Sequence, residues 1–282
     1  MVSVREKALA FRRLHSGGEA FIIPNPYDVG TAVILEQLGF KALATTSSGF
    51  AFSRGLQDNH INRDQMIVHV RDIVSATSLP VSADLENGFF DSPEEVANTI
   101  KMAGAAGLAG GSIEDSTNGS VDEPLYSLGQ AKDRMVAAVE AKAGLSNDFV
   151  LTARAENFLV GRGSVDDVIA RLQAYQEAGA DVLYAPGLSR LEDVVSIVSN
   201  VDLPVNVLAR PADADFSAAK LSAVGVKRIS VGGALARAAL GAFVRASREM
   251  LDEGTFDFGS EAIAHADIQA MFEDRSQIPS QK

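Results

Sequence analysis

The sequence predicts an α/β fold of the (β/α)8 TIM-type barrel class, and three observations support this prediction. Eight short apolar runs alternate with longer segments whose apolar residues recur at helical spacing. The length of 282 residues is normal for one barrel. Several helical segments end in glycine just before the next strand, as helix C-terminal caps do, at Gly39, Gly107, Gly179 and Gly225. The alternative is a doubly wound sheet, which normally has fewer strands and a glycine-rich first turn that this sequence lacks.

The eight expected strands are spaced along the whole barrel region. They are FIIPN (21–25), ALATTS (42–47), PVSADL (80–85), GLAGGSIE (107–114), FVLTAR (149–154), VLYAP (182–186), PVNVLA (204–209) and RISVGG (228–233). Segments such as DQMIVHVRDIVSAT and VDDVIARLQAYQEAG supply the helices between them. The stretch Ser92–Glu95 is typical of a helix start, with a cap, a proline and two acids.

The two ends of the chain are interpreted by the same patterns. Residues 1–16 predict a helix before the first strand, and residues 234–252 predict the eighth helix. We therefore expect one barrel over 1–252, with 253–282 as a C-terminal arm or tail.

Composition excludes several classes of function. A formal net charge of −12 disfavours binding to nucleic acid or an anionic membrane, although a small anionic substrate remains compatible. The absence of cysteine excludes disulfides, cysteine-bound metals and a thiol nucleophile. The N-terminus lacks a signal-peptide core and no apolar run approaches ~18 residues, so we expect a soluble cytoplasmic protein.

Acidic residues gather where the expected strands end. In a barrel this is the catalytic face, because the βα-loops meet there. Strand period places Asp84 and Glu86, two residues apart, on the same side. Neighbouring strand ends and loops add Asp58, Glu114 and Asp115. The alternative for each acid is a helix cap or a surface ion pair.

These acids predict a divalent cation. Several carboxylates at one partly buried site repel one another unless a cation neutralises them. Oxygen ligands suit Mg²⁺ or Mn²⁺, and Mg²⁺ keeps several waters. We expect Asp84 as a direct ligand, with Glu86, Glu114 and Asp58 acting through water.

Two features of this face suit an anionic substrate. Arg154, at the end of the fifth strand, is placed to clamp a carboxylate, or alternatively balances Glu114 or Glu156. The stretch ATTSSGF (44–50) is expected to be a loop that presents backbone N–H groups, or alternatively an ordinary turn. Other chemistries find no support. There is no G-x-S-x-G motif for a serine nucleophile, no lysine at the carboxyl end of an expected strand for a Schiff base, and no metal-ligand spacing of histidines. The glycines of VGGALARAAL keep a phosphorylated substrate open.

Taken together, these motifs resemble the isocitrate lyase/phosphoenolpyruvate mutase superfamily. The resemblance rests on PNPYDVGTAVILEQLGFKALATTSSGFAFSRGLQD, PVSADLENGF, GSIEDS, TARAENFL, GADVLYAPG, PVNVLA and RISVGGALARAAL, in order over nearly all of the first 245 residues. It implies a barrel whose eighth helix is swapped between subunits of a homodimer or homotetramer. It also implies a Mg²⁺ site at Asp84 and Glu86, where the family has D-x-D, with Glu114, Asp58 and Arg154 at matching positions. The substrate loop falls on Thr45, Thr46 and Ser47.

One departure from the family pattern bears on the reaction. Isocitrate and methylisocitrate lyases carry a K-K/R-C-G-H loop with a catalytic cysteine, whereas this chain has EDSTNGSVDEPLYSL there. Phosphonate-processing members place a lysine and an asparagine on this loop, and only the asparagine has a counterpart, Asn118. The candidates for the acid that replaces the cysteine are Ser116, Thr117 and Asn118.

The resemblance implies a Mg²⁺-dependent lyase that cleaves a C–C bond of a small 2-oxo or 2-hydroxy carboxylic acid through an enolate. The expected catalytic residues are Arg154, Asp58, Glu114 and Asn118. The alternatives are a phosphonomutase or phosphonopyruvate hydrolase acting on a P–C bond, and a non-catalytic barrel used for binding.

Overall fold

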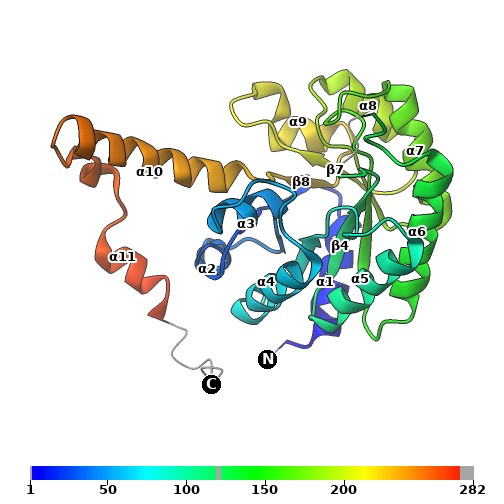
Figure 1. The fold of residues 1–282 in the computed structure, drawn as a ribbon, viewed down its shortest axis with the longest axis horizontal. Helices are drawn as coiled ribbons and strands as arrows, with labels where there is room; N and C mark the ends of the chain where they lie inside the picture. Colours follow the sequence, from blue (N-terminus) through cyan, green and yellow to red (C-terminus); the bar gives the residue numbers. More distant parts are fainter. Residues whose placement is uncertain (1, 119–121, 274–282) are drawn as a thin grey trace.

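The computed structural model describes residues 2–118 and 122–273, and its centre is a parallel barrel (Figure 1). The strands are β1 (Phe21–Ile23), β2 (Leu43–Ala44), β3 (Val81–Asp84), β4 (Gly110–Glu114), β5 (Val150–Arg154), β6 (Val182–Tyr184), β7 (Val205–Leu208) and β8 (Arg228–Ser230). Neighbouring strands in this sheet pair in parallel, in the order β1-β8-β7-β6-β5-β4-β3-β2. Ala44 N donates to Pro24 O at 3.0 Å and links the two ends of this order. The predicted fold class is confirmed.

Helices alternate with the strands. They are α1 (Val4–His15), α2 (Val29–Gln37), α3 (Ser47–Ser53), α4 (Arg63–Ala76), α5 (Pro93–Ala105), α6 (Leu128–Ala143), α7 (Val165–Ala178), α8 (Leu191–Ser199), α9 (Ala218–Ala223), α10 (Ala234–Asp252) and α11 (His265–Ala270), with short 3-10 turns η1 (Ala214–Phe216) and η2 (Asp257–Glu261). Helix α5 starts as predicted, because Ser92 Oγ accepts from Glu95 N and Pro93 is the first helical residue. The four predicted cap glycines all have positive φ, which explains the use of glycine there.

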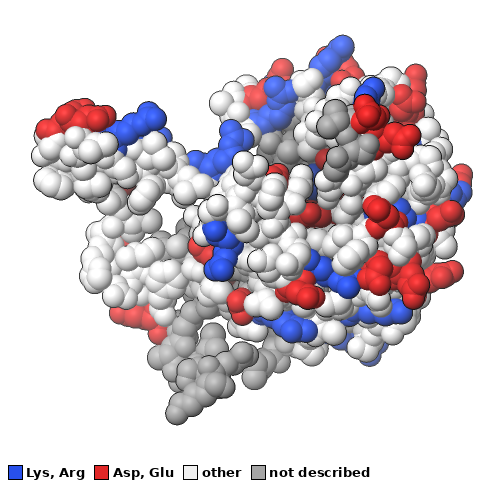
Figure 2. Space-filling model, in the orientation of Figure 1, with Lys and Arg blue, Asp and Glu red and all other residues white. Residues whose placement is uncertain are grey.

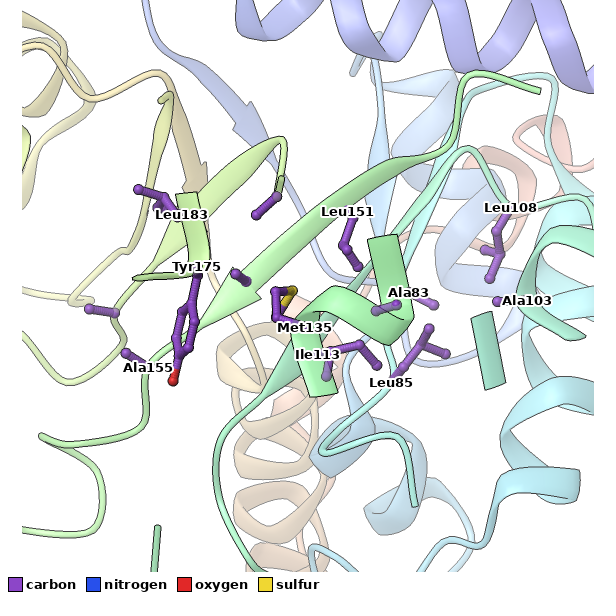
Figure 3. Close-up of a cluster of buried hydrophobic side chains, with 14 of the residues drawn as sticks. Ala83, Leu85, Ala103, Leu108, Ile113, Met135, Leu151, Ala155, Tyr175 and Leu183 are labelled. Atoms are coloured by element: carbon purple, nitrogen blue, oxygen red, sulfur yellow. The ribbon is translucent and has the colours of Figure 1, made fainter. Parts of the chain in front are cut away.

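The core lies mainly between the strands and the surrounding helices. Figure 3 shows part of it, where Leu85 and Ile113 lie beside Met135 of α6. A second cluster joins Ala8 and Phe11 of α1 to residues mostly at strand starts, so α1 covers the amino end of the barrel. Helix α1 does not cover the opposite end of the barrel, where the carboxyl ends of the strands lie and where a functional site is expected.

Helix α10 leaves the body of the barrel (Figure 1). Among the described residues of this helix only Ala236 is buried, and the helix packs against α3 and η2. Apolar side chains on and after it are exposed, including Phe243 at 69% and Leu251 at 84%. On the face seen in Figure 2, the projecting segment is mostly uncharged, and acidic and basic side chains lie together at its far end. The division into a barrel over 1–252 and an arm over 253–282 stays a prediction.

No helix in the described part of the chain has both the length and the apolarity to span a membrane.

Candidate functional site at the carboxyl ends of the strands

A cavity of about 190 Å³ opens into the barrel from the carboxyl ends of the strands. Asp58, Asp84 and Arg154 of the predicted site line it, together with Thr45, Thr46 and Ser47. Glu86, Glu114 and Asn118 are not among its lining residues. The structure thus brings six of the nine predicted residues to one small hollow, and the roles of all nine stay predictions.

Arg154 is the centre of a partly buried ion-pair cluster. Its Nη1 lies 3.3 Å from Asp84 Oδ1 and 3.1 Å from Glu114 Oε2, and its Nε donates to Glu156 Oε1. Its guanidinium carbon is 5.3 Å from the centre of the Tyr184 ring. Arg154 therefore spans three acids on neighbouring strand ends.

The electrostatics of this cluster follow from burial. Burial alone would lower the pKa of Arg154, but the charges of Glu114, Glu156 and Asp84 raise it well above its ordinary value. Burial raises the pKa of Glu114 and of Glu156, and the charge of Arg154 opposes both shifts. The arginine therefore remains charged and holds together carboxyl groups that burial disfavours as anions.

Glu86 reaches the cluster by a different route from the one expected. Strand β3 ends at Asp84, and Glu86 has φ of 48°, in the left-handed region. The alternation of side chains along a strand therefore does not determine where the Glu86 side chain points. The prediction placed Asp84 and Glu86 on the same side by strand alternation, and that reason was wrong. The Glu86 side chain is buried, and its Oε1 has no hydrogen-bond partner. Burial, then the charges of Asp84 and Asp58, raise its pKa to about 8.

The hydroxyl-rich stretch after β2 contacts Asp84. Ser47 donates from N and Oγ to Asp84 Oδ2, at 3.3 and 2.9 Å, and Thr45 Oγ1 accepts from Asp84 N at 3.1 Å. The expectation of a loop over 44–50 was wrong in part, because α3 begins at Ser47. Thr46 caps it by accepting from Gly49 N, a helix start that the run of hydroxyls concealed.

Asp58 and Asn118 lie at the margins of the site. Asp58 is exposed and follows α3, and partial burial and the charge of Asp84 raise its pKa. Asn118 accepts from Ser116 Oγ at 2.8 Å and precedes 119–121, which fall outside the described residues.

Asp115 has a structural set of partners. Its Oδ2 accepts from Arg171 Nη1 at 2.9 Å and from the Tyr175 hydroxyl at 2.5 Å, and its Oδ1 accepts from Glu156 N at 2.8 Å. Because these bonds use both oxygens, Asp115 fixes the ends of β4 and β5 relative to α7.

The acids of this cluster fit a hard cation by their chemistry. Within the described residues no three acidic or histidine side chains form a metal-binding group, and Arg154 lies between Asp84 and Glu114. A site with one direct carboxylate and several waters does not need such a group. The buried Glu86 Oε1 without a partner is an unsatisfied acceptor of the kind a cation or its water would satisfy.

Several lining residues were not singled out from the sequence. They are Ile23, Asn25, Ser82, Ala83, Ser112, Leu159, Tyr184, Asn206, Leu208, Arg228 and Ser230. The remaining lining residues, Ala44, Ser48, Gly232 and Gly233, lie in the stretches 44–50 and 231–240, which the sequence motifs indicate. A signal was available for some of the missed residues. Asn206 and Arg228 are strongly polar residues inside apolar strand runs, and a polar residue at a buried strand position needs a partner there.

The comparisons with known proteins agree on one family. The family model described as phosphoenolpyruvate phosphomutase matches residues 11–251. A crystal structure from Burkholderia cenocepacia J2315, of a protein described provisionally as a lyase/mutase, is 54% identical, covers 95% of this chain and 97% of its own, and has a TM-score of 0.93. The 2-methylisocitrate lyase of Escherichia coli (strain K12) is 34% identical over 68% of this chain and 69% of its own. A phosphonopyruvate hydrolase solved with oxalate and Mg²⁺ is 24% identical, covers 95% of each chain at a TM-score of 0.83, and shows the shared fold.

Proposed function

The chain belongs to the phosphoenolpyruvate phosphomutase family, whose relatives include lyases and mutases, and from this membership we propose a specific reaction. The protein acts as a Mg²⁺-dependent lyase that cleaves a C–C bond of a small 2-oxo or 2-hydroxy carboxylic acid and releases a pyruvate-like product. The observation that carries the proposal is the cavity of about 190 Å³, which suits an acid of a few carbons and is lined by Asp84, Asp58 and Arg154.

The metal part of the proposal rests on the carboxylates around Arg154. Asp84 would be the direct ligand, with Glu86, Glu114 and Asp58 acting through water. A divalent cation bound there supplies a Lewis acid for the carboxylate of the substrate and the oxygen next to it. The phosphonopyruvate hydrolase solved with Mg²⁺ and oxalate supports the choice of ion.

The residues of the chain would then divide the remaining work. Thr45, Thr46 and Ser47 would position the substrate carboxylate. For a 2-oxo acid, the bond between C3 and C4 would break, the C4 fragment would leave as CO2 or a carbonyl compound, and the bonding electron pair would be shared between C3 and the oxygen on C2. Arg154 would stabilise that charge as a fixed donor in a partly buried site. A proton returned to C3 then completes a pyruvate-like product. For a 2-hydroxy acid, loss of the hydroxyl proton would instead form the carbonyl of the pyruvate-like product and leave the electron pair on the departing carboxylic acid, which then takes up the proton. Ser116, Thr117 and Asn118 are the candidates to deliver the proton.

A second candidate is phosphonomutase or phosphonopyruvate hydrolase chemistry on a P–C bond. Two features favour it over a cysteine-dependent lyase: the chain has no cysteine, and it carries Asn118 on the loop after β4. A non-catalytic binding role is the third candidate, which the set of acids around Arg154 disfavours. We also propose a cytoplasmic homodimer or homotetramer.

Pyruvate release, coupled to NADH oxidation, tests the reaction. The panel comprises oxaloacetate, 2-methylmalate-type acids, methylisocitrate and phosphonopyruvate, each with Mg²⁺ and with EDTA. Release that EDTA abolishes, from one carboxylic acid, supports the lyase. Release from phosphonopyruvate alone moves the protein to the hydrolase alternative. If no compound releases pyruvate, the lyase and the hydrolase are both contradicted. A mutase assay that follows the phosphorus-containing product then distinguishes the mutase from the non-catalytic alternative.

A further inference from the structure

Two arginines, the partly buried Arg154 and the buried Arg228, line the same cavity, and their partners differ in charge. Arg154 contacts the three carboxylates of Asp84, Glu114 and Glu156. Arg228, at the start of β8, is 5% exposed and forms no ion pair with any described residue. Acidic side chains therefore balance the charge of Arg154, whereas none in the described part of the chain balances that of Arg228.

Neutral groups hold Arg228 in place. Its Nε donates to Asn206 Oδ1 at 2.9 Å, and its Nη2 donates to Thr152 Oγ1 at 3.0 Å. Its Nη1 lies 3.4 Å from His15 Nε2, while His15 Nδ1 lies 2.9 Å from Phe11 O. His15 therefore donates to Phe11 from Nδ1 and accepts from Arg228 at Nε2. Burial, then the charge of Arg228, lowers the pKa of His15 to about 3, so this neighbour is neutral at physiological pH.

These bonds leave part of the guanidinium free. A guanidinium has five N–H donors, and the three contacts above use three, which leaves two. Burial also lowers the pKa of Arg228 to about 10, opposite in direction to the shift at Arg154. A buried cation without a counter-ion is costly, and an anion in the cavity would relieve that cost.

The position of Arg228 sets the length of a ligand. Its partner Thr152 precedes Arg154 by two residues on β5, so their side chains share one face of the strand at levels roughly 6.6 Å apart. A four-carbon acid with charged groups at both ends spans about that distance. The alternative is an arginine that only links β5, β7 and α1, but that role does not explain the two spare donors beside a cavity.

We propose that Arg228 forms an anion-binding floor of this cavity, where it binds a carboxylate: either the distal carboxylate of a molecule whose other end lies at Asp84 and Arg154, or a separate small carboxylate. This inference rests on the proposed function only for the identity of the upper end. The floor itself follows from Arg228, its neutral partners and the cavity.

A matched pair of ligands tests the floor. Malate and 2-hydroxybutyrate have the same four-carbon chain and the same 2-hydroxy acid end, and they differ in a terminal carboxylate against a methyl group. Calorimetry with Mg²⁺ should show the wild type binding malate at least tenfold more tightly, because a charged pair in a buried site is strong. Acetate alone tests a separate small anion at the floor.

Two variants assign that preference to Arg228. Arg228→Gln should reduce the malate preference at least tenfold and leave 2-hydroxybutyrate unchanged. Asn206→Asp places a carboxylate beside Nε, neutralises the arginine from within and should abolish the same preference while the fold is retained. It decides the question if the glutamine variant does not fold. Acetate that binds the wild type but neither variant, without a malate preference, assigns the floor to a separate anion.

Two results would overturn the inference. One is a wild type that neither prefers malate over 2-hydroxybutyrate nor binds acetate. The other is an Asn206→Asp protein that keeps both the malate preference and acetate binding. Binding of oxalate with Mg²⁺, measured by the same calorimetry, tests the proposed metal site at Asp84 and Arg154 independently of Arg228. An oxalate signal without a malate or acetate signal retains the proposed metal site and removes the floor. An Arg228-dependent malate preference without an oxalate signal retains the floor and removes the metal site.

Discussion

Arg154 Nη1 lies 3.3 Å from Asp84 Oδ1, so the end of β5 is joined to the end of β3 across β4. The same nitrogen lies 3.1 Å from Glu114 Oε2 on the intervening strand. One cation therefore holds three adjacent strand ends in position.

Replacement of Arg154 should cost both stability and activity. Arg154→Met leaves Glu114 and Glu156 buried without a cation, and we expect a loss of about 3–5 kcal/mol in the free energy of unfolding. Arg154→Lys retains a charge and should lose less stability, yet activity should fall roughly 100-fold because the fork of donors is gone. Urea unfolding and pyruvate release measure the two effects. Equal stability of the methionine variant and the wild type would contradict the cluster.

Replacement of Asp84 should remove the response to metal. At about 100 times the dissociation constant, Mg²⁺ with oxalate should stabilise the wild type by about 2.7 kcal/mol. Asp84→Ala should show no gain in a thermal shift experiment. Asp58→Ala, which lacks only a water-mediated contact in this proposal, should keep a reduced gain. A full gain in Asp84→Ala would place the metal elsewhere.

The raised pKa of Glu86 predicts a pH dependence of the metal-free protein. The folded state holds a proton up to about pH 8 that the unfolded chain releases near 4.5, so stability falls as pH rises between these values. Glu86→Gln removes this pH-dependent contribution. The difference in stability between this variant and the wild type should therefore shift in favour of the variant by about 3–4 kcal/mol between pH 5 and pH 8. Denaturant unfolding in EDTA measures it. Glu19→Gln, at an exposed position, is the control and should leave the profile unchanged.

Loss of the Tyr175 hydroxyl should destabilise the ends of β4 and β5. Tyr175→Phe removes a hydrogen bond to Asp115, which is 3% exposed, and we expect a cost of about 1.5–3 kcal/mol because the acceptor is charged. Urea unfolding is the measurement. Activity should decline with only a small change in the oxalate response, since Asp115 does not line the cavity. An unchanged unfolding midpoint would show that Arg171 suffices as a partner.

The exposed apolar side chains of α10 predict an oligomer. Leu240 and Phe243 are 43% and 69% exposed on a helix that leaves the barrel, as expected if it packs on another subunit. Light scattering should give a mass of at least two chains, and the double variant Leu240→Glu/Phe243→Glu should give one. Leu38→Glu, at an exposed apolar residue on the barrel, is the control. A monomeric wild type would contradict the swapped eighth helix.

Local patterns in the sequence determined much of this protein. The alternation of strands and helices, the cap at Ser92 and the glycines before the strands depend on neighbours a few residues away, and each is found in the structure. The gathering of Asp84, Glu114 and Arg154 also follows, because carboxyl ends of parallel strands meet at one end of a barrel.

Tertiary structure decided what depends on distant neighbours. Glu86 turns inward through a left-handed backbone that no alternation describes. Arg228 meets Asn206, Thr152 and His15, which lie 22, 76 and 213 residues away in the chain. Such contacts are set by strand register and by closure of the barrel, so the sequence can place a polar residue in a buried strand but cannot identify the group it faces.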